Sequence, residues 1–262
     1  MTEIRDSTNN RIRPDDEDSL FHYLNLNSFI SLLQTSAIHI RRLDKFPQDD
    51  FEATKTKIEI EQRSKELRTL FREPHDYKSL AQMENGLNKS YRQKIFAHCW
   101  HLSSHESTMH WNQYAPNSSD IAIKSKVINL SKAINYKEGF RILKIKYEDF
   151  DDPNSSRLPN PYSLTELGTR KRIEYSVENE VRLIINAYLD LFPDIAEDGS
   201  VTSLNIPEFL KIEVDLELMI EEIRINPNSP NWQFNMVKEL IRKYGFDIKV
   251  SLSTLSNKSF SL

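Results

Sequence analysis

The feature that most constrains the fold is the run Val177–Ile185, in which charged and apolar residues alternate. Residues i and i+2 of a strand lie on the same face, so Glu178, Glu180 and Arg182 would share one face. The opposite face would carry three apolar residues, Val181, Leu183 and Ile185. We therefore expect a rigid strand that is anchored in the core and holds two carboxylates and a guanidinium in one row.

The rest of the chain mixes short strands irregularly with helices. Alternating or apolar-aromatic runs predict strands near 20–24, 37–42, 95–101, 121–125, 141–147, 211–215, 223–225 and 246–252. Helical spacing of apolar residues predicts helices near 26–33, 127–134 and 230–244, and a further helix that starts at 103–106 and ends at Pro116. This pattern predicts an α+β fold with a mixed, largely antiparallel sheet and flanking helices.

The 262 residues are enough for one large domain or two small ones. We expect a disordered polar tail at 1–18 and a single α+β domain at 19–262. Within this domain, residues 53–95 alternate basic and acidic side chains around a thin apolar stripe. They predict a charged helical insert, broken at Pro74 and around Gly86, whose charges form a solvated face.

Composition argues against several classes of protein. Lys and Arg total 35 against 39 Asp and Glu, a net charge of -4, so nothing favours nonspecific nucleic-acid binding. The 5 glycines form neither a dinucleotide-binding nor a P-loop motif. A single cysteine rules out an internal disulfide and fits the cytoplasm. No apolar run approaches the roughly 20 residues that span a bilayer, so we expect no membrane partner.

A second chemically rich segment runs from Phe96 to Ser125 and holds four histidines, two tryptophans, a tyrosine, a glutamate and Cys99. Zinc sites require tight ligand pairs on one face. His98 and Cys99 point to opposite faces of a strand and no second ligand cluster follows, so no metal is favoured. Cys99 then fits a small buried residue. Trp111 and Tyr114 suit either a planar ligand or the core.

The acidic row allows two interpretations. Paired carboxylates beside an arginine suit proton abstraction, hydrogen bonding to sugar hydroxyls or stabilisation of an oxocarbenium-like centre. The alternative is a solvent-facing strand that carries an ion-pair ladder on the surface.

The order of the motifs resembles that of bacterial domain-of-unknown-function family twenty-nine seventy-one, over nearly the whole chain outside the tail and the insert. Leu24, where members often carry Arg, departs from the pattern, as does the lack of a Gly before 121–125. The family recurs near mobile elements and phage-defence loci, which implies a defence effector or toxin. The residues that carry the resemblance are Tyr23, Arg42–Asp44, Phe46, Asp49, Phe51, Glu52, Cys99–His101, Glu106, Ser107, Met109, Trp111, Tyr114, Ile121–Ser125, Lys171, Arg172, Glu178, Glu180, Arg182, Val214–Leu216, Pro227 and the Trp232 helix.

A weaker resemblance is to the layout of ADP-ribosyltransferases: an initial aromatic-histidine strand, a central aromatic helix and a late Glu-x-Glu strand. It implies a split sheet and NAD as co-substrate. Glu180 would be the catalytic carboxylate and Glu178 would activate the acceptor. The implied NAD-binding residues are Tyr23, His22, Arg42, Trp111 and Tyr114, and the implied substrate-binding residues are Arg182, Ser107 and Glu52.

The favoured hypothesis is thus an ADP-ribosyltransferase-like enzyme of a bacterial defence system that acts on a protein or nucleic acid, with a defence partner or an antitoxin. Two alternatives stay open. One is a metal-dependent nuclease or hydrolase that uses Glu178 and Glu180 with Asp49 and Glu52. The other is a non-enzymatic sensor of a phage component.

Overall fold

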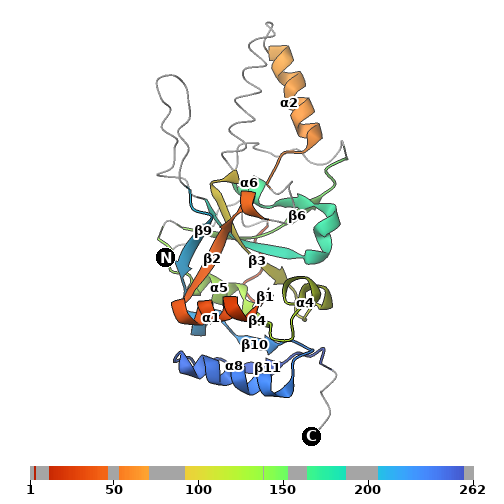
Figure 1. Cartoon of the computed structure of the whole chain (residues 1–262). Coiled ribbons are helices and arrows are strands. Elements are labelled where there is room, and N and C mark those ends of the chain that lie inside the picture. The colour runs from red at the N-terminus through yellow and green to blue at the C-terminus, as the bar shows by residue number, and fades with distance from the viewer. Residues whose placement is uncertain are drawn as a thin grey trace.

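The computed structural model describes residues 3, 12–46, 53–70, 92–137, 139–152, 164–186 and 206–256. Its centre is a nine-stranded sheet with the path β11-β10-β4-β1-β3-β2-β9, in which β8 pairs with β3 and β5 pairs with β8 (Figure 1). The strands are β1 (Ser19–Leu24), β2 (Ala37–Arg42), β3 (Ile95–Leu102), β4 (Ile121–Lys126), β5 (Arg141–Lys144), β8 (Glu180–Asn186), β9 (Phe209–Glu213), β10 (Glu222–Ile225) and β11 (Val250–Leu252).

Helices flank this sheet, and a two-stranded sheet lies beside it. The helices are α1 (Leu26–Thr35), α2 (Lys57–Leu70), α4 (Thr108–Tyr114), α5 (Val127–Ala133), α6 (Leu164–Gly168), α7 (Leu216–Met219) and α8 (Asn231–Lys243), with 3-10 turns η2 (Leu43–Lys45) and η3 (Ile173–Glu178). The small sheet pairs β6 (Lys146–Glu148) with β7 (Arg170–Arg172). Only this pair and β10–β11 are parallel among the described strand pairs, which confirms the predicted α+β class with a mixed, largely antiparallel sheet.

Strand β3 is the hub of the main sheet because it has three neighbours. Along one edge it pairs with β8 from Ile95 to His101. Its other edge is shared, since β2 pairs only with Phe96 and Ala97, and β1 only with His101 and Leu102. Away from β3, strand β1 pairs with β4 and strand β2 pairs with β9. The two strands therefore diverge, and among the described strands neither pairs with the middle of this edge of β3. Helix α1 joins the two diverging strands.

The predicted strand at 177–185 begins later than expected. Residues 173–178 form η3, Asn179 takes a left-handed conformation with φ 40°, and β8 starts at Glu180. Asn tolerates this conformation, and its Nδ2 donates to the Leu102 carbonyl at 2.5 Å. Glu178 therefore does not share a strand row with Glu180, whereas the apolar face of β8 is buried as predicted.

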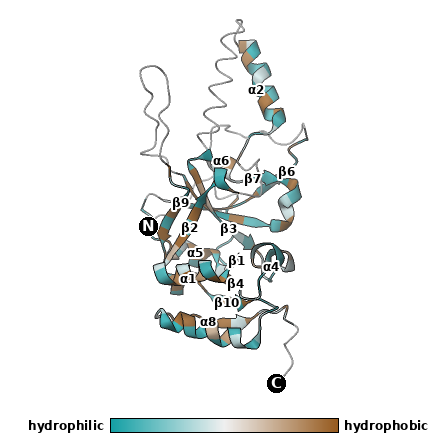
Figure 2. Cartoon of the chain, viewed as in Figure 1, coloured by the Kyte–Doolittle hydropathy of each residue, from teal (hydrophilic) through white to brown (hydrophobic). Residues whose placement is uncertain are grey.

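The main core lies between the sheet and helices α1, α5, α7 and α8 (Figure 2). On α8 the buried residues Gln233, Val237 and Ile241 repeat every four positions. Trp232, which we placed on the buried stripe, is 64% exposed, because it precedes Gln233 by one position and so lies about 100° around the helix from that buried residue. Within the described residues no helix is both long and apolar enough to cross a membrane.

The predicted tail and insert are described only in part. Residues 12–18 lie against α5, where the Val127 and Ile128 amides donate to the carbonyls of Asp18 and Asp16 at 3.1 and 2.9 Å. The described part of the insert includes α2, a polar helix that stands away from the sheet (Figures 1 and 2). Pro74 and Gly86, where we predicted breaks, lie outside the described residues.

A core substitution in β8 should destabilise the fold strongly, since this strand lies between β3 and β5. Leu183 is 0% exposed, so Leu183→Ala should lower the free energy of unfolding by about 2–5 kcal/mol in urea titrations. Leu218→Ala is the matched control, because Leu218 is 38% exposed, and its cost should be below about 1 kcal/mol. Equal losses for the two variants would show that β8 is not the centre of the core.

Candidate functional site

A cleft opens where β1 and β2 part from β3. Its acidic lobe, a cavity of about 330 Å³, contains Glu178, Glu180 and Lys171. Its basic lobe, of about 350 Å³, contains His39, His98 and no carboxylate among its described lining residues. The two lobes share part of their lining, namely His22, Tyr23, Arg41, Phe46, Cys99, Trp100 and Tyr114.

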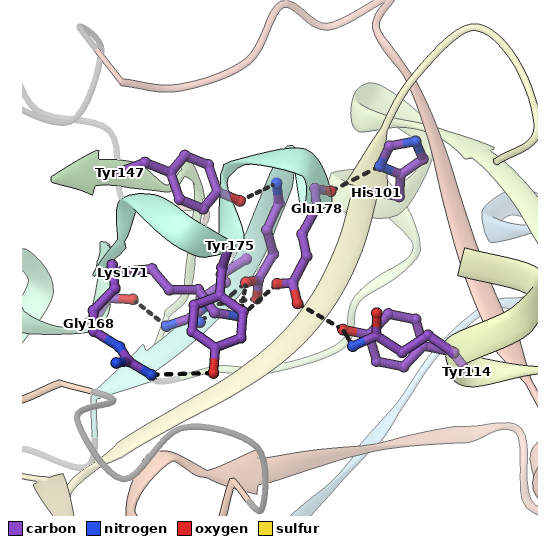
Figure 3. A network of polar contacts seen from close by, with 11 residues as sticks. His101, Tyr114, Tyr147, Gly168, Lys171, Tyr175 and Glu178 are labelled. Carbon is purple, nitrogen blue, oxygen red and sulfur yellow. Dashed lines mark hydrogen bonds and ion pairs between the residues drawn. The ribbon is translucent and has the colours of Figure 1, made fainter. Parts of the chain in front are cut away.

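A buried cluster of opposite charges forms one wall of the acidic lobe (Figure 3). Lys171 Nζ lies 2.5 Å from Glu178 Oε2 and 3.2 Å from Glu180 Oε2, and so joins the two carboxylates. Arg182 donates to both oxygens of Glu180, at 2.7 Å from Nε and 3.1 Å from Nη2. Because all four side chains are buried, each charge depends on the others for compensation.

Short elements place these charges. Glu178 ends η3 and Glu180 begins β8, and the left-handed Asn179 between them turns both carboxylates toward Lys171 of β7. The Glu180 amide donates to Tyr147 Oη at 2.8 Å, which ties the start of β8 to β6. Behind it, Arg182 Nη1 donates to the Gly168 carbonyl at 3.0 Å (Figure 3).

Glu180 is held as an anion. Burial by itself would raise the pKa of its carboxyl, but the charges of Arg182 and Lys171 and the hydrogen bonds from Arg182 and Cys99 outweigh burial and lower the pKa to about 2. Burial, together with the neighbouring Glu180 charge, raises the pKa of the Cys99 thiol well above its ordinary value. Cys99 is therefore a neutral hydrogen-bond donor beside the carboxylate rather than a thiolate nucleophile.

Two histidines supply acceptors to the acidic lobe. Nδ1 of His22 lies 2.9 Å from the Cys99 carbonyl, and Nδ1 of His101 lies 2.8 Å from the Glu178 carbonyl. A carbonyl oxygen only accepts, so both Nδ1 atoms carry the proton. Burial lowers both pKa values, to about 4 for His22, so the rings are neutral and each Nε2 is an acceptor.

An aromatic wall faces the carboxylates. Tyr114 Oη donates to Glu178 Oε1 at 3.0 Å (Figure 3). The His110 ring lies 5.6 Å from the Tyr114 ring, 5.4 Å from Tyr23 and 3.9 Å from His101, centroid to centroid. Burial raises the pKa of Tyr23 to about 12 and raises that of Tyr114 further, so both phenols stay protonated.

Two predicted contact residues instead support this wall. Trp111 does not line the cleft, because it packs edge-on against Tyr23 at 5.0 Å and its Nε1 donates to Glu106 at 3.1 Å. Ser107 caps α4, and its amide donates to Tyr23 Oη at 2.8 Å. Both residues position the ring of Tyr23 rather than contact a ligand.

The structure does not bring the remaining predicted residues into the cleft. Arg42 points to the other face of β2, where it pairs with Asp44 at 2.5 Å and donates to the Ile206 carbonyl at 2.5 Å, while Arg41 lines the cleft. Arg182 is 0% exposed behind Glu180, so it acts on that carboxylate rather than on a substrate. Glu52, predicted for the substrate, and Asp49 lie outside the described residues.

Four further residues line the acidic lobe, and the sequence pattern indicates no role for any of them: Lys171, Arg41, His101 and His110. Lys171 could have been predicted from the sequence, because buried acids require a cation as a partner and Arg170–Arg172 is a run of three cations. In the part of the chain that the structure describes, no group of three or more His, Cys, Asp or Glu residues gathers as metal ligands would.

Comparison of the chain with protein-family models, curated proteins and solved structures finds no match. The chemistry of the cleft is therefore argued from its own geometry. The two resemblances described from the sequence stay predictions.

Stability should fall as the pH falls below neutral. Burial lowers the pKa of His22 and His110 to about 4 and lowers that of His98 well below its ordinary value. Unfolded histidines titrate near ~6.5, so between this pH and about 4 the unfolded chain binds protons that the folded chain does not. Urea titrations should show less stability at pH 5 than at pH 7, by about 1–2 kcal/mol for each such histidine.

His22→Gln should reduce this pH dependence, because it removes one of the groups that is neutral only in the folded state. His105→Gln is the control and should leave the pH dependence unchanged, since His105 is exposed before and after unfolding. Equal stability of the wild type at the two pH values would contradict neutral buried histidines.

Removal of the bridging cation should be costly. Lys171→Met leaves Glu178 and Glu180 buried with less compensation, so the free energy of unfolding should fall by about 3–5 kcal/mol. Addition of Glu178→Gln to this variant should restore part of the loss, because one of the two negative charges is then gone. The exposed Lys243→Met is the control, with an effect within about 0.5 kcal/mol. Strictly additive effects of Lys171→Met and Glu178→Gln in urea titrations would argue against the bridge.

Proposed function

We propose that the cleft is the active site of an NAD-using ADP-ribosyltransferase-like enzyme, with Glu180 as the catalytic carboxylate. The observation that carries the proposal is a pair of buried carboxylates, Glu178 and Glu180, opposite an aromatic wall in a cleft where the sheet parts. The parting of β1 from β2 supports the proposal, because the resemblance implies a split sheet.

The state of Glu180 suits a reaction in which positive charge develops on a sugar. Cleavage of the bond between ribose and nicotinamide gives an oxocarbenium-like centre, and a fixed anion in a low-dielectric cleft stabilises that centre. Arg182 and Lys171 keep Glu180 ionised and in one orientation. Its pKa of about 2 means that no change near neutral pH removes the charge.

The transfer breaks one bond to the ribose carbon and forms another. The ring nitrogen of nicotinamide takes the electron pair of the breaking bond and leaves as neutral nicotinamide. An acceptor oxygen or nitrogen then forms the new bond to the ribose carbon, and its proton passes to a base. In this proposal the base is Glu178. Its carboxylate is oriented by Tyr114 Oη, 3.0 Å from Oε1, and by Lys171 Nζ, 2.5 Å from Oε2.

The other walls suit the rest of this co-substrate. Neutral His22 and His101 offer acceptor nitrogens to the ribose hydroxyls. Tyr114, Tyr23 and His110 offer the aromatic surface on which a nicotinamide ring would stack. The arrangement thus contains a group for each part of a ribosyl-nicotinamide.

The biological role in this proposal rests on the family resemblance rather than on the cleft. It is that of an effector or toxin of a bacterial defence system, acting in the cytoplasm on a protein or nucleic acid, with a defence partner or an antitoxin. The metal-dependent alternative would require a divalent ion to displace Lys171 from between Glu178 and Glu180, which makes it the less favoured chemistry.

Substitution of the catalytic carboxylate gives the direct test. With labelled NAD and a cell lysate as the source of acceptor, Glu180→Gln should reduce NAD turnover by about 100-fold or more, because the developing charge loses its anion. Glu239→Gln on the exposed face of α8 is the matched control and should equal the wild type. NAD turnover by Glu180→Gln at the wild-type rate would refute the assignment.

Glu180→Gln leaves Arg182 buried without its counter-charge, so loss of activity in this variant could reflect unfolding. A second variant separates the two causes. Glu178→Gln keeps the pair of Glu180 and Arg182, and it should slow transfer to the acceptor more than hydrolysis of NAD. Thermal melts establish that each variant is folded at the assay temperature. Cleavage of RNA or DNA that EDTA abolishes, without NAD turnover, would support the metal-dependent alternative instead.

A further inference from the structure

The basic lobe of the cleft holds the guanidinium of Arg41. The side chain of Arg41 makes no hydrogen bond or ion pair with any residue that the structure describes, and its Nε is buried. Glu208, whose charge interacts with that of Arg41, is itself paired with Lys45 at 3.0 Å. A partly buried cation without a paired anion is costly, so a bound anion would be stabilised there.

Among the described residues, an aromatic ring contacts this guanidinium and no carboxylate does. Arg41 lies over the ring of Phe209, its partner across the β2–β9 pair, with its central carbon 5.3 Å from the ring centroid. Stacking of this kind uses the face of the guanidinium and leaves the N–H groups at its edge available. Arg41 lines both lobes, so these donors lie at the junction of the cleft.

Two further buried nitrogens of the same lobe have no hydrogen-bond partner among the residues that the structure describes. Nε1 of Trp100, a residue that is only 2% exposed, is a donor, and Nδ1 of His98 is a donor in one of the two neutral tautomers. Both residues line the basic lobe. A buried polar nitrogen without a partner destabilises the protein, and an acceptor-rich ligand group would offset that cost.

The start of α1 adds to this positive field. Asn25 and Ser28 line the basic lobe, and Asn25 caps the ten-residue helix through its side chain, which accepts from the Ser28 amide at 2.8 Å. The positive end of the helix dipole therefore faces the same lobe as Arg41. In the described lining of this lobe, no Asp or Glu offsets it.

We propose that the basic lobe binds the phosphate group of a ribosyl phosphate, with Arg41 as its principal contact and with the sugar over Glu178 and Glu180. The polarity of the cleft defines the ligand: acceptors in the acidic lobe suit hydroxyl groups, and donors in the basic lobe suit an anion. The inference deepens the proposed function, since it assigns the part of the cleft that would select phosphorylated ribosides. It does not require that the NAD bond is cleaved.

Calorimetric titration with three small probes tests this subsite in the absence of NAD. Ribose 5-phosphate should bind more tightly than inorganic phosphate, because it reaches both lobes, and also more tightly than ribose. Arg41→Gln should weaken the binding of ribose 5-phosphate and of phosphate by about tenfold or more, the loss of a charged hydrogen-bond donor. Arg41→Lys, which keeps the charge but not the fork, should lie between the two proteins.

Arg242→Gln on the exposed face of α8 is the matched control and should bind all three probes as the wild type does. Arg41 makes no ion pair with a described residue, so Arg41→Gln should melt close to the wild-type temperature. If that variant unfolds, Arg41→Lys alone decides, and unchanged binding by it would overturn the proposal. Equal binding of ribose 5-phosphate by wild type and Arg41→Gln, or equal affinity of the wild type for phosphate and ribose 5-phosphate, would do the same.

The probes separate this inference from the proposed function. Phosphate-dependent binding that requires Arg41, found together with an absence of NAD turnover, would retain the subsite and remove the transfer reaction. NAD turnover that Arg41→Gln leaves unchanged would retain the reaction and remove the subsite.

Discussion

The cleft depends on one buried interaction, the sharing of Lys171 between Glu178 and Glu180 with Arg182 behind them. Charges removed from water are tolerated only when they are paired and hydrogen-bonded. This requirement ties together β7, the end of η3 and the start of β8, which supply Lys171, Glu178 and Glu180. The same pairing that stabilises the charges fixes the carboxylates in one position and keeps Glu180 ionised.

The space in front of these charges exists because β3 is longer than its contacts with β1 and β2. These two strands bond to opposite ends of one edge of β3, and α1 bridges them. The middle of that edge, from His98 to Trp100, therefore lines a cavity instead of a third strand pair. A fully paired sheet of the same strands would have no cleft at this position.

The buried titratable groups of the cleft differ in whether they carry a charge. Burial is the largest influence on His22, His98 and His110, so it lowers their pKa values and leaves them neutral. Glu180 has two cations within hydrogen-bond distance, so the same burial leaves it charged. The result is a cleft with acceptors at one end and, at the other, donors that have no partner among the described residues. Both proposals use this polarity.

Local pattern was sufficient for the fold class and for the main strands, because alternation of apolar residues along β8 and β3 is visible in the sequence itself. It also selected Tyr23, Tyr114, Glu178 and Glu180, which line the acidic lobe of the cleft. It failed where a turn interrupts a period: Asn179 takes Glu178 out of the strand row. It also chose Arg42 over Arg41, since which face of β2 meets the cleft is set by neighbouring strands.

The sequence by itself determined which groups are available: an acidic pair beside an arginine, a histidine-rich aromatic segment and an apolar framework for a mixed sheet. Only the tertiary structure decided that Lys171 lies between the acids, that Trp111 and Ser107 support Tyr23, and that Arg41 forms no ion pair with a described residue. The physical reason is that strand periodicity is local, whereas compensation of a buried charge depends on partners brought together from distant parts of the chain.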